Sequence, residues 1–222
     1  MEAVILAIVF FVLAGLGLGV WWFSADHVGK RRLQSVASTP IAEAAEGALV
    51  KITGTLVLAH EAELEGPITG RPCVGYVVEV KERTQAGARA NWDTIVTKED
   101  AVAFIIEDAT GRALVQAAGA HLVLVRDGHV HSGSLSDHAE RARAFLMQQG
   151  TPSENVLWKK KSVRYEEGVL ERGEEVSVLG MATWESVPDS LRSDSHADGA
   201  RWLVIRPPSG ATLTVSDDPG TV

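Results

Sequence analysis

AVAFIIEDATGRALVQA, residues 101–117, contains two apolar runs joined by the turn-forming residues Asp108-Ala109-Thr110-Gly111. Two such runs on either side of a glycine-containing turn are typical of a β-hairpin. Upstream, ALVKITGTLVLA (48–59) alternates apolar and polar residues around Gly54, which predicts a strand that bends at the glycine. A strand, a glycine bend and then a hairpin is how a small curved barrel begins, including barrels of the OB type.

Further strands are expected on both sides of this core pattern. Turn residues between Gly66 and Pro72 precede a strand over 73–80, and a polar loop is expected over 85–91. The run HLVLV predicts a strand over 121–125 that ends at the Asp127-Gly128 turn. Similar runs predict strands over 162–170, 175–184, 201–206 and 211–216.

One amphipathic helix is expected after the N-terminal region, over 137–149. Asp137 and Glu140 have capping-box spacing, and Gly150 and Pro152 are typical of a helix end. Its apolar stripe contains Ala139, Ala142, Phe145 and Leu146. The fold class expected is therefore mainly β (α+β), with OB-like small-barrel character and one amphipathic helix.

A faint internal repeat adds a second hypothesis about the organisation of the domain. FIIEDATGRALV (104–115) aligns without gaps on LVIRPPSGATLT (203–214), with apolar runs on either side of a small-residue turn in both. Two related β units, about 46–125 and 162–217, would explain this, with the helix between them. Chance similarity between two hairpins explains it equally well.

AVILAIVFFVLAGLGLGVWWF, residues 3–23, predicts an N-terminal transmembrane helix. These 21 residues contain no charge, and as a helix they would span about 31 Å, close to the thickness of a bilayer's hydrocarbon core. Residues 1–32 are therefore expected to form a membrane anchor with a basic flank. A short linker over 33–45 would follow, and a β domain over 46–218. The residues expected at the membrane interface are Trp21, Trp22, Lys30, Arg31 and Arg32.

The anchor is expected to remain uncleaved, because the chain starts with the acidic Met1-Glu2 and the apolar run is long for a signal peptide. Positive charge lies only on the C-terminal side of the run. By the positive-inside rule, this predicts a single-pass membrane protein with a cytoplasmic domain.

The charge balance argues against a nucleic-acid partner. The net charge is −8, with about +1 on residues 1–32 and −9 on the rest, whereas binding a phosphate backbone requires clustered Lys and Arg. The single cysteine, Cys73, allows no intramolecular disulfide and no multi-cysteine zinc site, and buried packing is the interpretation favoured for it.

Candidate chemical sites are few. His129 and His131 would face the same side of a strand, with Asp127 nearby, and could hold a divalent metal, but a solvated hairpin end explains them better. No nucleophile elbow or phosphate-binding loop is present, so no catalytic residue and no cofactor is predicted. A solvated acidic rim is expected at Glu166, Glu167, Glu171, Glu174 and Glu175.

Aromatic residues offer two further interpretations. Trp158, followed by Lys159, Lys160 and Lys161, could touch anionic headgroups, although a strand edge guarded by lysines explains this cluster as well. Trp92, Trp184 and Trp202 are expected to be core or rim packing residues.

Several phrases resemble the GIDE domain, also called the "beside a membrane" (BAM) domain. These are EGALVKITGTL, GPITGRPCVGYVVEV, FIIEDATGRALV, VRYEEGVLERGEEVSVLG and LTVSDD, in family order over about 46–218. The resemblance implies a relation to the membrane part of mitochondrial E3 ubiquitin ligases, in which a zinc-binding RING performs ubiquitin transfer. A RING needs about eight Cys/His ligands for two zinc ions, and one cysteine does not fit that need.

The function expected is therefore a membrane-anchored, non-catalytic binding or scaffold domain. Its partners would be the lipid bilayer and an unidentified protein or ligand. The family-derived alternative is a ubiquitin-ligase-like protein that works with a zinc or RING module on a separate chain.

Overall fold

The computed structural model describes residues 25–57, 64–86, 89–131, 137–150, 162–186 and 201–222. The expected span over 3–23 lies outside these residues, as do Trp21, Trp22 and the stretch 158–161. Among the described helices, none combines the length and apolar character needed to cross a membrane.

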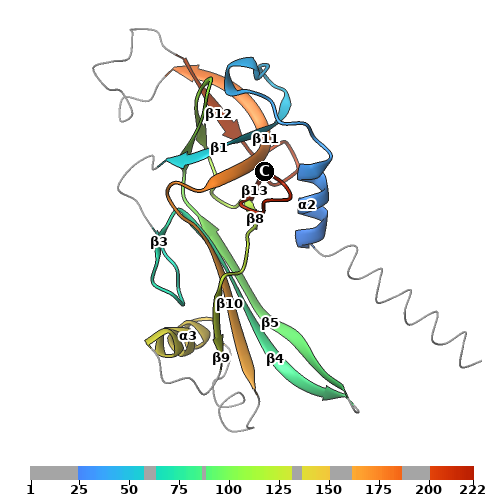
Figure 1. Cartoon of the computed structure of the whole chain (residues 1–222), viewed down its shortest axis with the longest axis vertical. Coiled ribbons are helices and arrows are strands. Elements are labelled where there is room, and N and C mark those ends of the chain that lie inside the picture. The colour runs from blue at the N-terminus through green and yellow to red at the C-terminus, as the bar shows by residue number, and fades with distance from the viewer. Residues whose placement is uncertain (1–24, 58–63, 87–88, 132–136, 151–161, 187–200) are drawn as a thin grey trace, which may run out of the picture.

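A closed five-stranded barrel forms the upper part of the molecule in Figure 1. Its strands follow the order β1-β6-β7-β12-β11, and pairing of β11 with β1 closes the ring. Neighbours are antiparallel except β7 and β12, which run parallel. The bounds are Leu49–Val57 for β1, Phe104–Asp108 for β6, Gly111–Val115 for β7, Glu175–Ser186 for β11 and Arg201–Arg206 for β12. This closed barrel fits the OB-like character expected.

Both parts of the proposed repeat contribute to one barrel core. Ile52, Phe104 and Val115 from the first range are buried with Val178 and Ile205 from the second. The hairpin over 104–115 forms as predicted, because Asp108 and Gly111 pair at its turn. The two ranges are therefore parts of one folded body.

The second half of the alignment is not a hairpin, which corrects the repeat hypothesis. Strands β12 and β13 (Thr214–Ser216) both pair antiparallel with the same strand, β11, one after the other. Pro207 and Pro208, which interrupt them, lack the N–H needed to continue a ladder. Strand β8 (His121–Val123) follows β7 along the chain and pairs in parallel with β13, as β7 pairs in parallel with β12.

A second sheet projects from the barrel as a long stalk, in the order β5-β4-β10-β9. The bounds are Gly75–Ala86 for β4, Arg89–Ala101 for β5, Gly128–His131 for β9 and Val163–Leu170 for β10. The prediction of a polar loop over 85–91 was wrong, because β4 and β5 pair with each other as far as Ala86 and Arg89. A short hairpin of β2 (Leu64–Glu65) and β3 (Pro72–Cys73) precedes β4.

Helix α3 (Asp137–Gln148) lies at the stalk and matches the predicted helix to within one residue. The predicted apolar stripe is the buried one: Ala139, Ala142, Phe145 and Leu146. These side chains form a second, smaller core with β-sheet residues such as Val78 and Tyr165. The stalk sheet therefore has its own hydrophobic support.

The region expected to hold a basic flank and a linker is folded onto the domain. Helix α2 (Ala25–Gln34) contacts β8, β11 and β13, and Leu33 is fully buried. The short 3-10 helix η1 (Ile41–Glu43) follows, and Ile41 belongs to the barrel core. Residues 33–45 are thus packed structure rather than a free connection.

Candidate functional site

The histidine candidates lie on β9 as predicted, on one side of the strand. His129 and His131 are exposed, and Val130 between them is buried. The Asp127 carboxylate is held by two hydrogen bonds from the Arg71 guanidinium, at 2.8 and 2.6 Å. Among the described residues, no group of three His, Cys, Asp or Glu side chains could hold a metal ion. These three candidates are thus not assembled into a metal site there.

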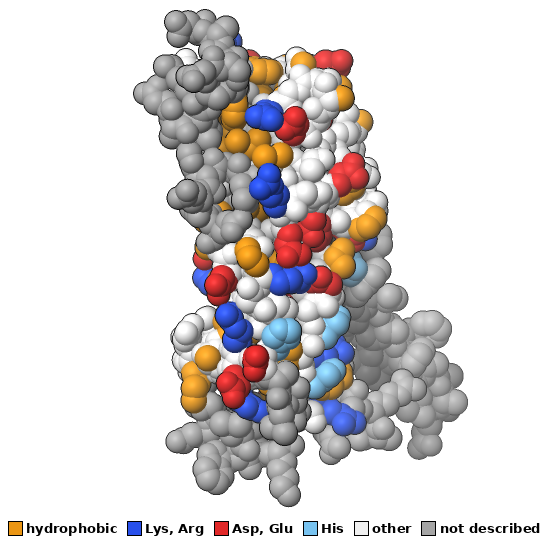
Figure 2. All heavy atoms as spheres, turned by 60° about the vertical axis from the view of Figure 1, so that its left-hand side comes forward, with side chains coloured by type: hydrophobic (Ala, Val, Ile, Leu, Met, Phe, Trp, Pro, Cys, Tyr) orange, Lys and Arg blue, Asp and Glu red, His pale blue; other side chains and the backbone are white. Residues whose placement is uncertain are grey.

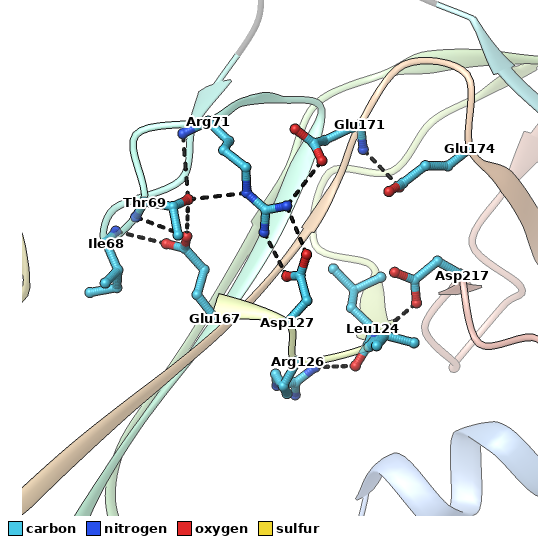
Figure 3. Close-up of polar contacts among 11 residues, drawn as sticks. Ile68, Thr69, Arg71, Leu124, Arg126, Asp127, Glu167, Glu171, Glu174 and Asp217 are labelled. Carbon is cyan, nitrogen blue, oxygen red and sulfur yellow. Dashed lines mark hydrogen bonds and ion pairs between the residues drawn. The ribbon is translucent and has the colours of Figure 1, made fainter. Parts of the chain in front are cut away.

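Arg71 links three segments at the junction of barrel and stalk (Figure 3). Besides Asp127, its guanidinium binds the Glu171 carboxylate at 3.1 Å, in the turn between β10 and β11. The hydrogen bond raises the pKa of Arg71 and lowers the pKa of Asp127, so the pair stays ionised. Bidentate geometry of this kind fixes orientation as well as charge. By binding Asp127 and Glu171, Arg71 fixes the turn that precedes β3.

Glu167 is fully buried, which corrects its expected place in a solvated acidic rim. Its carboxylate accepts hydrogen bonds from the backbone N–H groups of Ile68 (2.7 Å) and Thr69 (3.0 Å), and from the Thr69 hydroxyl. All three donors lie in the turn between β2 and β3. The carboxylate is occupied as an acceptor, so it holds a turn and does not act as a free base.

Glu166 departs from the acidic-rim expectation as well. It is 8 % exposed and binds Lys81 at 2.5 Å and Arg164 at 2.7 Å. Arg164 in turn lies over the Trp92 ring, with its guanidinium carbon 5.1 Å from the ring centroid. These contacts cross the stalk sheet from β10 to β4 and β5, on the face opposite the α3 core. They stabilise the stalk.

Glu171, Glu174 and Glu175 are less buried than this pair and fit the rim expectation better. Near them, burial raises the pKa of Asp217 to about 6, although the Val125 N–H donates a 2.8 Å hydrogen bond to its carboxylate. Burial also raises the pKa of Glu174. A carboxyl group with the raised pKa of Asp217 could exchange a proton near pH 6. The described contacts give it no nucleophile to activate.

Cys73 packs as predicted. Its side chain is buried, and burial raises the pKa of its thiol to about 12. A thiol with such a pKa is protonated at neutral pH and is a poor nucleophile.

Helix α2 binds the barrel through several contacts that the sequence pattern did not reveal. Lys30 forms a 2.7 Å ion pair with Asp218, and the Gln34 amide donates to the Gly220 carbonyl at 2.9 Å. Leu33 is buried in the same interface. Lys30, expected at the membrane interface, thus points to the C-terminal segment.

The other end of α2 contacts the stalk as well as the barrel. Asp26 lies 3.4 Å from Arg126 and 3.7 Å from His121. Arg126 also reaches Glu79 on β4, and His121 reaches Glu99 on β5, both at 3.4 Å. One carboxylate in the first turn of α2 is therefore connected to two strands of the stalk.

The remaining interface candidates are Arg31 and Arg32. The Arg31 side chain donates to the His27 carbonyl one turn earlier, at 3.2 Å, and Arg32 is exposed. Both lie on α2.

Comparison with known protein families identifies the family of this chain. A family model named GIDE and described as "E3 Ubiquitin ligase" matches residues 76–199, more than half of the chain. The chain belongs to the GIDE family. No curated protein and no solved structure matches it.

The GIDE match runs from β4 to beyond β11, so it includes the stalk sheet, α3 and three barrel strands. The zinc chemistry of a RING does not fit the residues present. The sequence has one cysteine, and the described part of this GIDE domain has no cluster of three potential ligands. No ubiquitin-transfer step follows from these residues.

Proposed function

We propose that this GIDE-family chain is a single-pass membrane protein whose β domain binds another protein or a ligand beside the membrane surface, without catalysis. The proposed span ends at Phe23, and α2 begins at Ala25, so no more than one residue separates them. The order of the chain thus leaves no room for a long tether.

The observation that carries this proposal is the double attachment of α2. Lys30, Leu33 and Gln34 hold it on the barrel, and Asp26 connects it to the stalk through Arg126 and His121. A helix bound at both ends cannot swing freely relative to the domain. A domain joined in this way to a membrane span would be kept at a short and nearly constant distance from the bilayer.

The polar clusters support a binding role over a catalytic one. The carboxylates of Glu167 and Asp127 are occupied by hydrogen bonds that hold turns, and the Cys73 thiol is buried. A catalytic site needs a nucleophile or base within reach of a substrate. The described residues show groups that hold the fold together instead.

Crosslinking in native membranes, followed by purification of the full chain, tests the proposal. Tethering raises the local concentration of a weak partner, so a specific crosslinked product should form with the full chain and decline when the apolar run is removed. Washing with alkaline carbonate should leave the full chain in the membrane pellet. Release into the supernatant would refute the anchor, and no specific product at any crosslinker concentration would refute the binding role.

Topology has its own experiment. The basic residues of α2 follow the apolar run, which favours a cytoplasmic domain. Protease added to sealed inside-out vesicles should then digest the domain. Full protection would place it on the other side of the membrane.

A second candidate function rests on the family description as an E3 ubiquitin ligase. In this case the GIDE domain would be one component of a ubiquitin-like transfer system, with the zinc module on a separate chain. Stoichiometric co-purification of a zinc-containing protein would favour this candidate. Purified chain alone should be inactive in a transfer assay, and activity without any partner would contradict both candidates.

A further inference from the structure

A pocket lies at the end of the barrel, on the side away from the stalk and α3. It has a volume of about 320 Å³, at the small end of the range for ligand sites. Its residues come from η1, from the β6–β7 turn and from the facing ends of β11 and β12. The lining residues are Ile41, Ala42, Thr110, Gly111, Arg112, Trp184, Arg201 and Trp202. We call this the barrel-end pocket.

Hydrogen bonds hold the η1 wall of the barrel-end pocket in place. The Asp108 carboxylate accepts from the Ile41 N–H at 2.8 Å, and the Thr110 hydroxyl accepts from the Ala42 N–H at 3.1 Å. The other oxygen of Asp108 accepts from the backbone N–H groups of Thr110 (2.7 Å) and Gly111 (2.9 Å). One carboxylate therefore fixes both η1 and the β6–β7 turn.

Hydrogen bonds also fix the part of the pocket wall formed by Trp184. The Trp184 indole N–H donates to the Ala44 carbonyl at 2.8 Å, which sets the plane of the ring. The backbone N–H of Trp184 donates to Glu46 at 3.0 Å, and its carbonyl accepts from Arg201 at 2.5 Å. A pocket with these two parts of its wall fixed is preorganised, so a ligand would not have to order it.

Two arginines form the edge of the barrel-end pocket, and we call them the arginine rim. The side chains of Arg112 and Arg201 are 49 % and 59 % exposed. Each contacts one carboxylate, Glu107 at 3.0 Å and Glu46 at 3.4 Å respectively. A guanidinium has five N–H donors, so both arginines keep donors for a further acceptor.

A small, largely buried apolar cluster lies beside the pocket. Trp202 lines the pocket and also packs with Ile105, Val57 and Leu114 in a cluster apart from the barrel core. On the face drawn in Figure 2, hydrophobic side chains gather at the upper end of the molecule, with basic and acidic side chains beside them. Aromatic and arginine side chains are the residue types enriched at the energetic centres of protein interfaces.

We propose that the barrel-end pocket binds an extended, acidic segment of a partner protein. One bulky apolar side chain of that segment enters the barrel-end pocket, which Trp184 and Trp202 both line, and a neighbouring carboxylate binds the arginine rim. The pocket is open on one side and small, so it suits one side chain of a longer segment. A single carboxylate needs only the arginine rim, whereas the repeated phosphates of a polynucleotide would need many more basic groups than the rim offers.

This inference deepens the proposed function, since it names where and what the domain binds. The test uses the full chain in lipid nanodiscs and a fluorescent pool of five-residue peptides, each with a central tryptophan or leucine between acidic residues. A matched pool carries lysines in place of the acidic residues. We expect saturable binding of the acidic pool, weaker at high salt, and at least tenfold weaker binding of the lysine pool.

Two variants with matched controls locate the binding. Ala42→Trp fills the pocket from an exposed position and removes no wall, and Ala118→Trp makes the same change at an exposed position elsewhere. Arg112→Gln removes one rim charge, and Arg141→Gln does so on α3. Both pocket variants should bind the acidic pool at least tenfold more weakly than the wild type, with both controls within twofold and melting temperatures unchanged.

Several results would overturn the inference. These are equal binding of the two pools, unchanged binding by Ala42→Trp, or binding of N-acetyltryptophanamide as tight as that of the peptides. The last result would assign the pocket to a small ligand. If Ala42→Trp still captures the crosslinked membrane partner, the proposed function stands and the pocket inference fails. If the wild type binds the peptides but captures no partner in membranes, the pocket inference stands and the proposed function fails.

Discussion

Glu167 gives the sharpest test of how the junction between barrel and stalk is held. In the variant Glu167→Gln, one acceptor oxygen becomes an NH₂ group. The remaining oxygen can still accept from the fully buried Ile68 N–H, and the Thr69 hydroxyl can rotate to accept from the new NH₂. The Thr69 N–H then faces a donor and loses its partner.

The expected cost combines two effects. An unsatisfied N–H costs about 1–3 kcal/mol when it is buried, and the part-buried Thr69 N–H should lie at the lower end of that range. Hydrogen bonds to a neutral amide are also roughly 1 kcal/mol weaker than those to a carboxylate. The free energy of unfolding should therefore fall by about 2–3 kcal/mol, which for a domain of this size lowers the melting temperature by roughly 4–12 °C.

Thermal unfolding followed by circular dichroism measures the decrease, and amide hydrogen exchange localises it. Exchange at Ile68 and Thr69 should accelerate far more than exchange in β11. The matched control is Glu140→Gln on the exposed face of α3, where a change within about 0.5 kcal/mol is expected. A Glu167→Gln variant as stable as this control would refute the argument that the carboxylate holds the turn.

Four further predictions concern other parts of the fold. Gly54→Ala should destabilise the fold by about 1–3 kcal/mol in chemical denaturation, because the new methyl group would lie 2.6 Å from the Glu107 carbonyl oxygen on β6. An unchanged denaturation midpoint would contradict this close approach. The carboxyl group of Asp217 should bind a proton near pH 6 when folded and near pH 3.9 when unfolded, so its own contribution to stability should rise as the pH falls from above 6 towards 4, opposite to that of carboxylates such as Asp127, whose pKa is lowered. Asp217→Asn should therefore raise the melting temperature most at pH 7.5 and least at pH 4, and an equal gain at both would be inconsistent with the raised pKa. Leu33→Ala should lower the free energy of unfolding by about 2–4 kcal/mol, because the side chain is fully buried. Lys30→Ala should lower it by less than about 1 kcal/mol, because its ion pair is partly exposed. The reverse order would mean that charge, not burial, attaches α2. The thiol of Cys73 should react with Ellman's reagent at pH 8 only after denaturation, and rapid reaction of the folded chain would disprove its burial.

The parts of the fold that follow from local pattern were predictable from the sequence. The hairpin over 104–115 has its turn fixed by Asp108, which bonds residues two and three positions later. Helix α3 carries its stripe at helical spacing. In both cases the stabilising contacts lie between residues close in sequence, or on one face with a clear period.

The parts that depend on contacts between distant residues were not predictable. Strand β5 is half-exposed to exposed along most of its length, so it has no buried period and is defined by its pairing with β4. Glu167 sits beside Glu166 in a charged phrase, but its partners Ile68 and Thr69 lie nearly one hundred residues earlier. The barrel-end pocket likewise combines η1 with the ends of β11 and β12. No local pattern indicates which of these side chains meet.

The topology also explains why a boundary near residue 125 cannot divide the domain. One insertion between β1 and β6 supplies β4 and β5 of the stalk, and a second insertion between β8 and β11 supplies β9 and β10. Strand β10 pairs with β4 along its entire length, from Val163 to Leu170. Each insertion alone would leave an unpaired strand edge and an exposed half of the α3 core. The two insertions must therefore fold together, and a fragment that ends near residue 125 should lose the stalk as well as the closure of the barrel by β11 and β12.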